Sequence, residues 1–163
     1  MAGLSGAGGN WQVIDEIAAR DVVQQQDNLS CGPACGEMLL GDRGINGANQ
    51  SLIAAETGVP VSAEDLAIAL NILDATSSRF WLGGTISLPG ATNYEIVEVL
   101  ISTGSWAAIL WETLAELGHI VIVDGLDDTK IMIRDPWNAT KYKMELEEFL
   151  NYWNLQAVYS LIR

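Results

Sequence analysis

A cysteine at the start of a predicted helix is the residue in this chain best suited to chemistry. Cys31 lies in a segment over residues 24–38 that is polar before the thiol and has apolar residues at helical spacing after it. Pro33 stands just inside the predicted helix start, where its missing N–H costs nothing. The unpaired N–H groups and the positive dipole end of a helix both favour a thiolate. We therefore predict that Cys31 is a nucleophile.

The single histidine of the chain is the candidate base for that thiolate. His119 begins an apolar run that predicts a buried strand, and a turn and a second strand over residues 130–134 follow it. Asp135 ends the second strand, so a hairpin would bring its carboxylate back beside His119. Thiol, imidazole and carboxylate would then share attack, proton transfer and orientation of the imidazole, as a cysteine hydrolase requires.

These residues resemble the motifs of the papain-like cysteine peptidases, and most closely those of the bacterial peptidase domains that cut leader peptides after double glycines. The shared features are Gln25 six residues before the cysteine, Cys-Gly-Pro-Ala at 31–34, Gly-His at 118–119 and Asp-Pro at 135–136. The resemblance implies that Cys31 is the nucleophile, His119 the general base and acid, Asp135 the orienting residue and Gln25 the oxyanion donor. It also implies a papain-like α+β fold, with an N-terminal helical half packed on a C-terminal antiparallel β-sheet.

The chain departs from the leader peptidases at Ser30, where they usually carry an acidic residue, and it is also similar to papain-fold toxin and effector domains. Three functions are therefore compatible with the sequence. The first is a cysteine peptidase that acts on a peptide or protein, with an inhibitor or immunity protein as a further possible partner. The second is a deamidase or transglutaminase-like enzyme that uses the same triad on a target protein. The third is a non-catalytic domain that binds peptides.

Several neighbouring residues compete with the predicted site residues. Gln24 and Gln26 flank Gln25, and only the spacing to the cysteine separates the three. Four residues are alternatives to Asp135 for orienting the imidazole: the acids Asp124, Asp127 and Asp128, and the amide Asn138. Cys35 lies one helical turn after Cys31, and packing in the core and redox pairing with Cys31 are both considered for it.

Composition limits the kind of partner and the size of the fold. The chain has 163 residues, 49% of them hydrophobic, and a net charge of −13 from 21 acidic and 8 basic residues. This length predicts one domain over residues 11–163, and the glycine-rich residues 1–10 predict a flexible tail. The negative charge argues against nucleic acid as a ligand, because phosphates would be repelled.

Neither a metal nor a cofactor is expected. Two cysteines four residues apart on one helix do not form a disulfide framework, and a lone histidine makes a structural zinc site improbable. The chain has no apolar run of transmembrane length and no secretory signal. We therefore expect a cytoplasmic protein or a domain of an exported bacterial protein, without a membrane segment in this chain.

The remaining patterns predict helices first and strands second, the order of an α+β fold. We expect helices over 49–57, 62–73, 93–102 and 145–153, and strands over 106–112, 118–125, 130–134 and 156–162. In the first helix, Leu52, Ile53 and Ala55 are expected to face inward. Residues 11–23 fit a short helix or an extended arm. Trp81 fits a wall of the substrate groove or, by the simpler interpretation, a core aromatic.

Overall fold

The computed structural model describes residues 11–76, 78–111 and 117–162 and confirms the α+β class. The predicted flexible tail, residues 1–10, lies outside the described residues. Three helices come before most of the strands in the chain. The elements are β1 (Ile14–Ala18), α1 (Cys31–Gly41), α2 (Gln50–Thr57), α3 (Ala63–Leu73), β2 (Arg79–Thr85), α4 (Asn93–Ser102), β3 (Trp106–Leu110), β4 (His119–Asp127), β5 (Lys130–Asp135), β6 (Thr140–Glu145), α5 (Leu146–Tyr152) and β7 (Trp153–Ile162).

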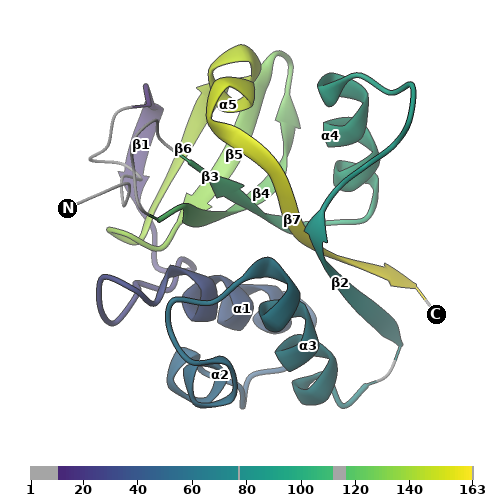
Figure 1. Ribbon diagram of the computed structural model, residues 1–163. Helices are drawn as coiled ribbons and strands as arrows, with labels where there is room; N and C mark the ends of the chain where they lie inside the picture. Colours follow the sequence, from purple (N-terminus) through teal and green to yellow (C-terminus); the bar gives the residue numbers. More distant parts are fainter. Residues whose placement is uncertain (1–10, 77, 112–116, 163) are drawn as a thin grey trace.

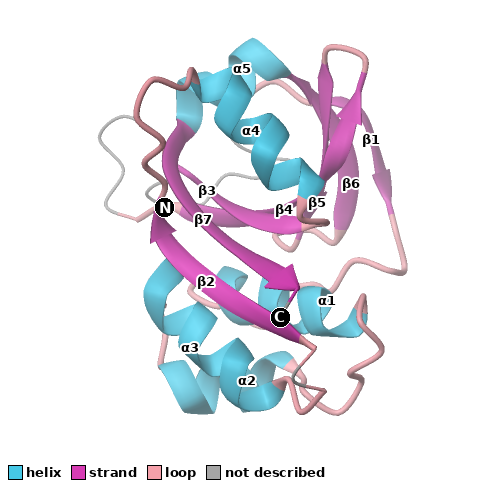
Figure 2. Ribbon diagram, turned by 90° about the vertical axis from the view of Figure 1, so that its right-hand side faces the viewer, coloured by secondary structure: helices cyan, strands magenta, loops and turns pink. Residues whose placement is uncertain are grey.

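The strands form a seven-stranded antiparallel sheet in the order β1-β6-β5-β4-β3-β7-β2. Helices α1, α2 and α3 lie on one face of this sheet, and α4 and α5 lie on the other (Figures 1 and 2). The edge strands β1 and β2 both come before α4 in the chain, so the sheet is not built from the C-terminal half alone. Of the two alternatives for residues 11–23, the extended arm is correct, because β1 pairs with β6.

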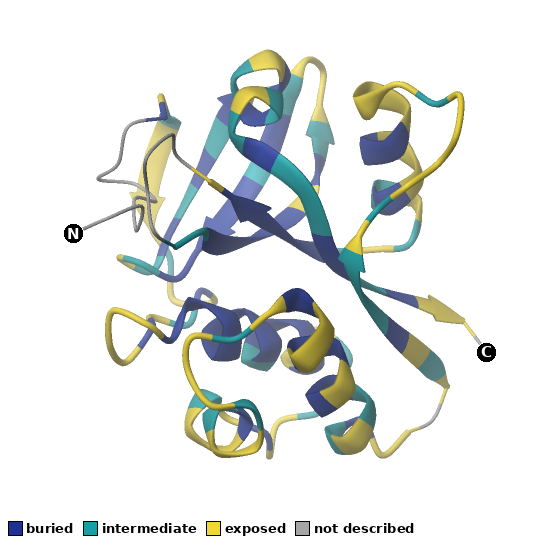
Figure 3. Cartoon of the chain, in the orientation of Figure 1, coloured by how far each residue is buried: buried dark blue, intermediate teal, exposed yellow. Residues whose placement is uncertain are grey.

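The central strands are buried on both faces, which explains their continuous apolar sequences. Ile120 and Ile122 of β4 pack in the core beneath α1 and α3, whereas Val121 and Val123 pack in the core beneath α4 and α5. Figure 3 shows β3 and most of β4 as buried, while the outer helix α2 is largely exposed. The two cores therefore hold the β4–β5 hairpin from both sides.

The expectation for α2 was wrong for two residues. Ile53 is fully buried, but Leu52 is 43% exposed and Ala55 is also exposed. Helix α2 has eight residues and packs against the rest of the molecule along one narrow face, where Ile53 is its buried residue. The simpler interpretation of Trp81 holds, because this side chain is buried and donates from Nε1 to Asp74. Within the described ranges, none of the helices is both long and apolar enough to span a membrane.

Candidate active site

Cys31 occupies the first residue of α1, as the sequence predicted. Helices α2, α3 and α4 each begin with a side chain that accepts a backbone N–H, from Asn49, Ser62 and Thr92. The N-cap of α1, Ser30, makes no such bond, because its hydroxyl donates to Asp27 Oδ1 instead (2.7 Å). The N–H groups of the first turn of α1 are therefore not covered by a capping side chain.

The residues around Cys31 fix the position of this helix start. A Cβ atom on Gly32 would lie 2.2 Å from Val61 Cγ1, so only glycine allows the loop before α3 to pack this closely. Cys35 is fully buried and its thiol donates to the carbonyl of Ile120 (3.3 Å), the residue that follows His119. The packing interpretation of Cys35 therefore agrees with the structure, and this residue links α1 to β4.

His119 and Asp135 meet at the ends of adjacent strands, as the hairpin argument predicted. Nε2 of His119 lies 2.7 Å from Oδ1 of Asp135, and both side chains are fully buried. Gly118 allows this position of His119, because a Cβ atom there would lie 2.6 Å from both Ile109 and Trp111. The Gly-His pair is thus a packing requirement as well as a sequence signal.

Asp135 has two further donors that hold its carboxylate in place. The backbone N–H of Trp137 donates to Oδ1 (2.9 Å), and the Tyr142 hydroxyl donates to Oδ2 (2.6 Å). Burial by itself would raise the pKa of Asp135, but the His119 charge, the His119 hydrogen bond and these two donors hold it below its ordinary value. Asp135 is consequently an anion that accepts from three partners.

The imidazole of His119 responds to this anion. Burial by itself would lower the pKa of His119, but the Asp135 charge and hydrogen bond raise it well above its ordinary value. The Cys31 thiol acts on the imidazole in the same direction, although Nδ1 forms no hydrogen bond with any described residue. Asp135 therefore occupies Nε2 and leaves Nδ1 as the ring nitrogen able to act on Cys31.

Aromatic side chains cover the His119–Asp135 pair. Trp11 stacks on His119 with ring centroids 6.2 Å apart, and Trp137 meets the same ring edge-on at 6.3 Å. Trp11 also donates from Nε1 to the Tyr142 hydroxyl (3.2 Å), so a chain of contacts runs from Trp11 through Tyr142 to Asp135. The sequence did not identify Trp11 or Tyr142, since neither has a local signal beyond its residue type.

Gln25 lies in the same region. Its backbone N–H donates to the carbonyl of Pro136 (2.9 Å), the residue after Asp135. The side chain is 8% exposed; Nε2 donates to the Asp27 carbonyl, and Oε1 has no hydrogen-bond partner in the described part of the chain. Gln24 and Gln26 are exposed. Burial and the Pro136 contact therefore favour Gln25 over its neighbours.

The competing acids have other partners in the structure. Asp124 is bound by Arg134, and Asp127 is bound by Lys143, while Asp128 and Asn138 are exposed. No group of three or more histidine, cysteine, aspartate or glutamate side chains among the described residues is arranged to hold a metal ion.

Comparison with known proteins places this geometry in a family. Residues 20–160 match the model of the Peptidase_C39 like family. The chain is 39% identical over 155 residues to cysteine protease effector 1 of Escherichia coli O1:K1:H7, covering 94% of this chain and 29% of that protein. The chain therefore spans less than a third of the length of this curated relative.

Solved structures show the same fold. A double glycine motif protease from an AMS/PCAT transporter, solved in complex with the leader peptide, superposes with a TM-score of 0.64 at 17% identity, covering 100% of this chain and 99% of that one. The peptidase domain of Streptococcus ComA, a bifunctional ABC transporter, gives a TM-score of 0.61 at 15% identity, covering 94% and 100%. The predicted papain-like arrangement of helices and sheet is thus confirmed.

Proposed function

This chain belongs to the Peptidase_C39 like family and is a cysteine peptidase, and from its geometry we propose that Cys31, His119, Asp135 and Gln25 carry out the hydrolysis. The buried 2.7 Å pair of His119 and Asp135 is the observation that carries this proposal. It fixes the ring through Nε2 and leaves Nδ1 for proton transfer with the thiol.

In the proposed reaction, the Cys31 thiolate attacks the carbonyl carbon of the scissile peptide bond, and the carbonyl π electrons move to oxygen. The second N–H of the Gln25 amide and the backbone N–H at the start of α1 donate to this oxyanion. Protonated His119 gives its Nδ1 proton to the leaving amine as the C–N bond breaks, which leaves a thioester on Cys31. Nδ1 then takes a proton from water, whose oxygen attacks the thioester and releases the acid and the thiolate.

Tyr142 and Trp11 act as positioning residues in this proposal. Tyr142 holds the second oxygen of Asp135, and Trp11 holds the Tyr142 hydroxyl while its ring lies on the imidazole. A carboxylate held from two sides cannot rotate away from His119 during turnover, so the imidazole keeps its orientation. The sheet thereby supplies a rigid support for the proton-transfer residue.

The physiological substrate is proposed to be a protein, and the chain is proposed to act as the peptidase domain of an effector. The 39% identity to a protein named cysteine protease effector 1 supports this. A domain of this kind would work in the compartment to which the effector is delivered. The producing cell would then need an inhibitor or immunity protein that blocks the Cys31 site.

Thiol labelling followed by product analysis tests the proposed function. Iodoacetamide should alkylate Cys31 much faster than Cys35, because Cys35 is fully buried and its thiol is bonded to Ile120. Protein substrates should then yield new amino termini, detected by mass spectrometry. Release of ammonia without cleavage would identify a deamidase instead. Equal, slow labelling of both cysteines would leave a peptide-binding domain.

A further inference from the structure

Gln25 lies in a part of the chain without regular secondary structure. Of the four residues proposed for the reaction, Cys31 begins α1, His119 begins β4 and Asp135 ends β5. Residues 23–25, by contrast, belong to no helix or strand, and a turn separates them from α1. The hydrogen bonds of a helix or strand therefore do not fix Gln25, although a functional side chain must be held to within about 0.5 Å of its productive position.

The side chain of Gln50, the first residue of α2, holds the main chain on both sides of Gln25. Its Nε2 donates to the carbonyl of Gln24 (2.8 Å), and its Oε1 accepts the N–H of Gln26 (2.9 Å). An amide side chain carries a donor and an acceptor next to each other, so it can bind two such groups at once. Both peptide bonds of Gln25 are therefore held by one side chain, as a neighbouring strand would hold them.

The sheet side of the molecule holds the same segment from the opposite direction. The peptide bond between Gln24 and Gln25 is trans, so its N–H points away from the carbonyl that Gln50 binds. This N–H donates to the Pro136 carbonyl (2.9 Å), next to Asp135 in the chain. The Gln25 side chain has its own support, the bond from Nε2 to the main-chain carbonyl of residue 27 (2.7 Å). The main chain of Gln25 is thus tied to the helical half and to the sheet half.

Gln50 is itself fixed to the helix that carries the proposed nucleophile. Its main-chain N–H belongs to the first turn of α2, where such groups have no partner within the helix. Glu37 of α1 accepts this N–H at 2.7 Å, and a carboxylate is favourable at the positive end of a helix. Glu37 follows Cys31 by six residues on the same helix. A chain of hydrogen bonds therefore leads from α1 through Gln50 to the residues on either side of Gln25.

We propose that Gln50 is a positioning residue for the oxyanion donor: by binding the main chain of Gln24 and Gln26, it sets where the Gln25 amide stands relative to Cys31. This inference rests on the proposed function, in which Gln25 donates to the oxyanion. Without the Gln50 amide, the two main-chain groups would bind water, and the segment could carry Gln25 away from the oxyanion. The loss would then fall on the transition state rather than on substrate binding.

Two thiol reagents separate this role from a general loss of structure. When the Cys31 thiol adds to acetyl-Gly-Gly aldehyde, an S–C bond forms, the C=O π bond breaks and the thiol proton ends on the oxygen, which takes the place of the oxyanion. Alkylation by iodoacetamide forms an S–C bond and releases iodide, so no oxyanion arises. Gln50→Ala should weaken aldehyde binding roughly tenfold, the effect of two ordinary hydrogen bonds, and leave the alkylation rate of Cys31 nearly unchanged.

Two further variants sharpen the test. Gln50→Glu keeps the shape of the side chain and the acceptor for Gln26, but a carboxylate cannot donate to the Gln24 carbonyl, so aldehyde binding should again weaken. Ser51→Ala is the matched control, because Ser51 donates to the side chain of Gln26 (2.8 Å) and not to its main chain. Ser51→Ala should bind the aldehyde like the unmodified protein, and a loss equal to that of Gln50→Ala would overturn the proposal.

The size of the loss in a folded variant decides the outcome. Gln50→Ala that binds the aldehyde within roughly threefold of the unmodified protein overturns the proposal, since less than one hydrogen bond would then be at stake. Thermal unfolding shows whether the variant is folded. If Gln50→Ala does not fold, Gln50→Glu is judged by the same limit.

A double variant shows whether Gln50 acts through Gln25. Gln25→Ala alone should weaken aldehyde binding about 10²-fold, the usual cost of one oxyanion donor. Adding Gln50→Ala should change this affinity little, because the donor that Gln50 positions is already gone. Full additivity of the two losses would refute this inference and leave the proposed function intact. If Gln25→Ala binds the aldehyde as well as the unmodified protein does, or if neither binds it, the proposed oxyanion site is refuted and this inference with it.

Discussion

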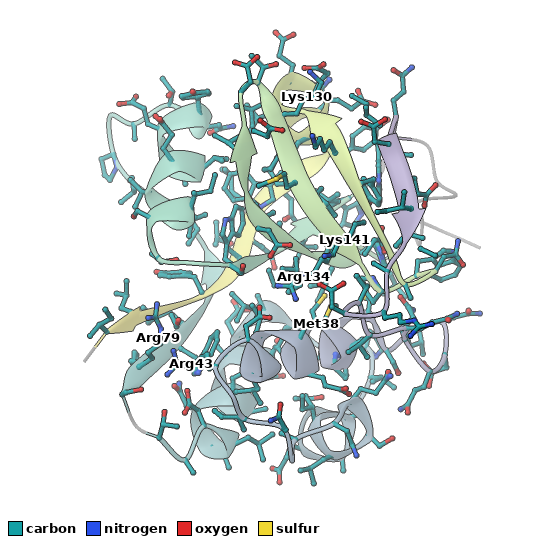
Figure 4. The ribbon with its side chains drawn as sticks, turned by 180° about the vertical axis from the view of Figure 1, so that it is seen from behind. Met38, Arg43, Arg79, Lys130, Arg134 and Lys141 are labelled. Carbon is teal, nitrogen blue, oxygen red and sulfur yellow. The ribbon has the colours of Figure 1, made fainter. Side chains whose placement is uncertain are left out.

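The two ends of helix α1 rest against the same hairpin but differ in how their polar groups are satisfied. At the first end, the Cys31 thiol is close enough to His119 to raise the pKa of its imidazole, and His119 Nδ1 is buried without a hydrogen-bond partner among the described residues. At the other end, Arg134 donates to both carboxylate oxygens of Asp42, at 3.1 and 2.6 Å, and also binds Asp124. Figure 4 shows Arg134 beside Met38, between the sheet and α1.

One end of α1 is tied to the sheet by the ion pairs of Arg134, and the other carries the thiol that we propose as the nucleophile. Buried polar groups normally have partners, and exceptions concentrate at functional sites. Of the buried side-chain atoms without partners among the described residues, two belong to His119 and Gln25. At the Arg134 end, burial would lower the pKa of the guanidinium, but Asp42 and Asp124 raise it. Arg134 and Asp135 are consecutive residues of β5, so this strand contributes one side chain to each end of α1.

The largest expected effect is at the reactive end. Cys31→Ala should lower kcat/KM by about 10⁴-fold or more, because the nucleophile is lost. The melting temperature should change little, since replacing the thiol by a methyl group at the first residue of α1 removes only one buried sulfur atom. Cys35→Ala is the control, and it should keep most activity while losing stability. Peptide hydrolysis and thermal unfolding measure the two quantities, and an active Cys31→Ala variant would refute the assignment.

Asp135→Asn should give the next largest loss, roughly 10²-fold in kcat, because the neutral amide no longer stabilises a protonated imidazole. Asp135 is the main cause of the raised pKa of His119, so the alkaline limb of the pH–rate profile should move to lower pH. A profile of kcat/KM against pH measures this shift. An alkaline limb that stays in place would mean that Asp135 does not control the imidazole.

The same pKa shift predicts how stability depends on pH. Because the folded state raises the pKa of His119 above its ordinary 6.5, the protonated imidazole stabilises the fold fully below that value. This stabilisation is lost as the pH rises through the folded pKa. Denaturant unfolding at a series of pH values should show the loss in the unmodified protein and a smaller one in Asp135→Asn.

The Arg134 end should respond in the opposite way to the Cys31 end. Arg134→Met leaves Asp42 and Asp124 without their cation and should lower the free energy of unfolding by about 2–3 kcal/mol, less than the roughly 3–5 kcal/mol for a fully buried pair, because both carboxylates are partly exposed. Activity below the melting transition should stay within a few-fold of the unmodified protein. Arg134→Lys, which keeps the charge but not the paired hydrogen bonds, should lose less stability.

The smallest expected effect concerns the support of Asp135. Tyr142→Phe removes the donor to Oδ2 and should lower kcat by about three- to tenfold, with KM nearly unchanged. The acid limb of the pH–rate profile should move to higher pH, because this hydrogen bond helps to hold the pKa of Asp135 low. A variant that loses stability but keeps both kcat and the acid limb would show that Tyr142 has only a structural role.

Much of the site could be predicted because its signals are local. Periodicity alone places three of these signals on their elements. They are a cysteine at the start of an apolar helical pattern, a Gly-His pair before an apolar run and an aspartate at a strand end. The hairpin then brings His119 and Asp135 together, because antiparallel strands joined by a short turn return on themselves. The helices predicted over 62–73 and 93–102 were correct for the same reason, because Ser62 and Thr92 cap their first turns through short-range hydrogen bonds.

Tertiary contacts decided what periodicity could not. Tyr142 stands between two lysines like any inward residue of an alternating strand, and its partner Trp11 is 131 residues away. The pairing of β1 with β6 and the contact of Arg134 with Asp42 likewise join segments that are distant in the chain. By itself, the sequence determined which residues could react and which elements carry them. Only packing of the helices on the sheet decided what surrounds those residues, because long-range contacts leave no periodic trace in the chain.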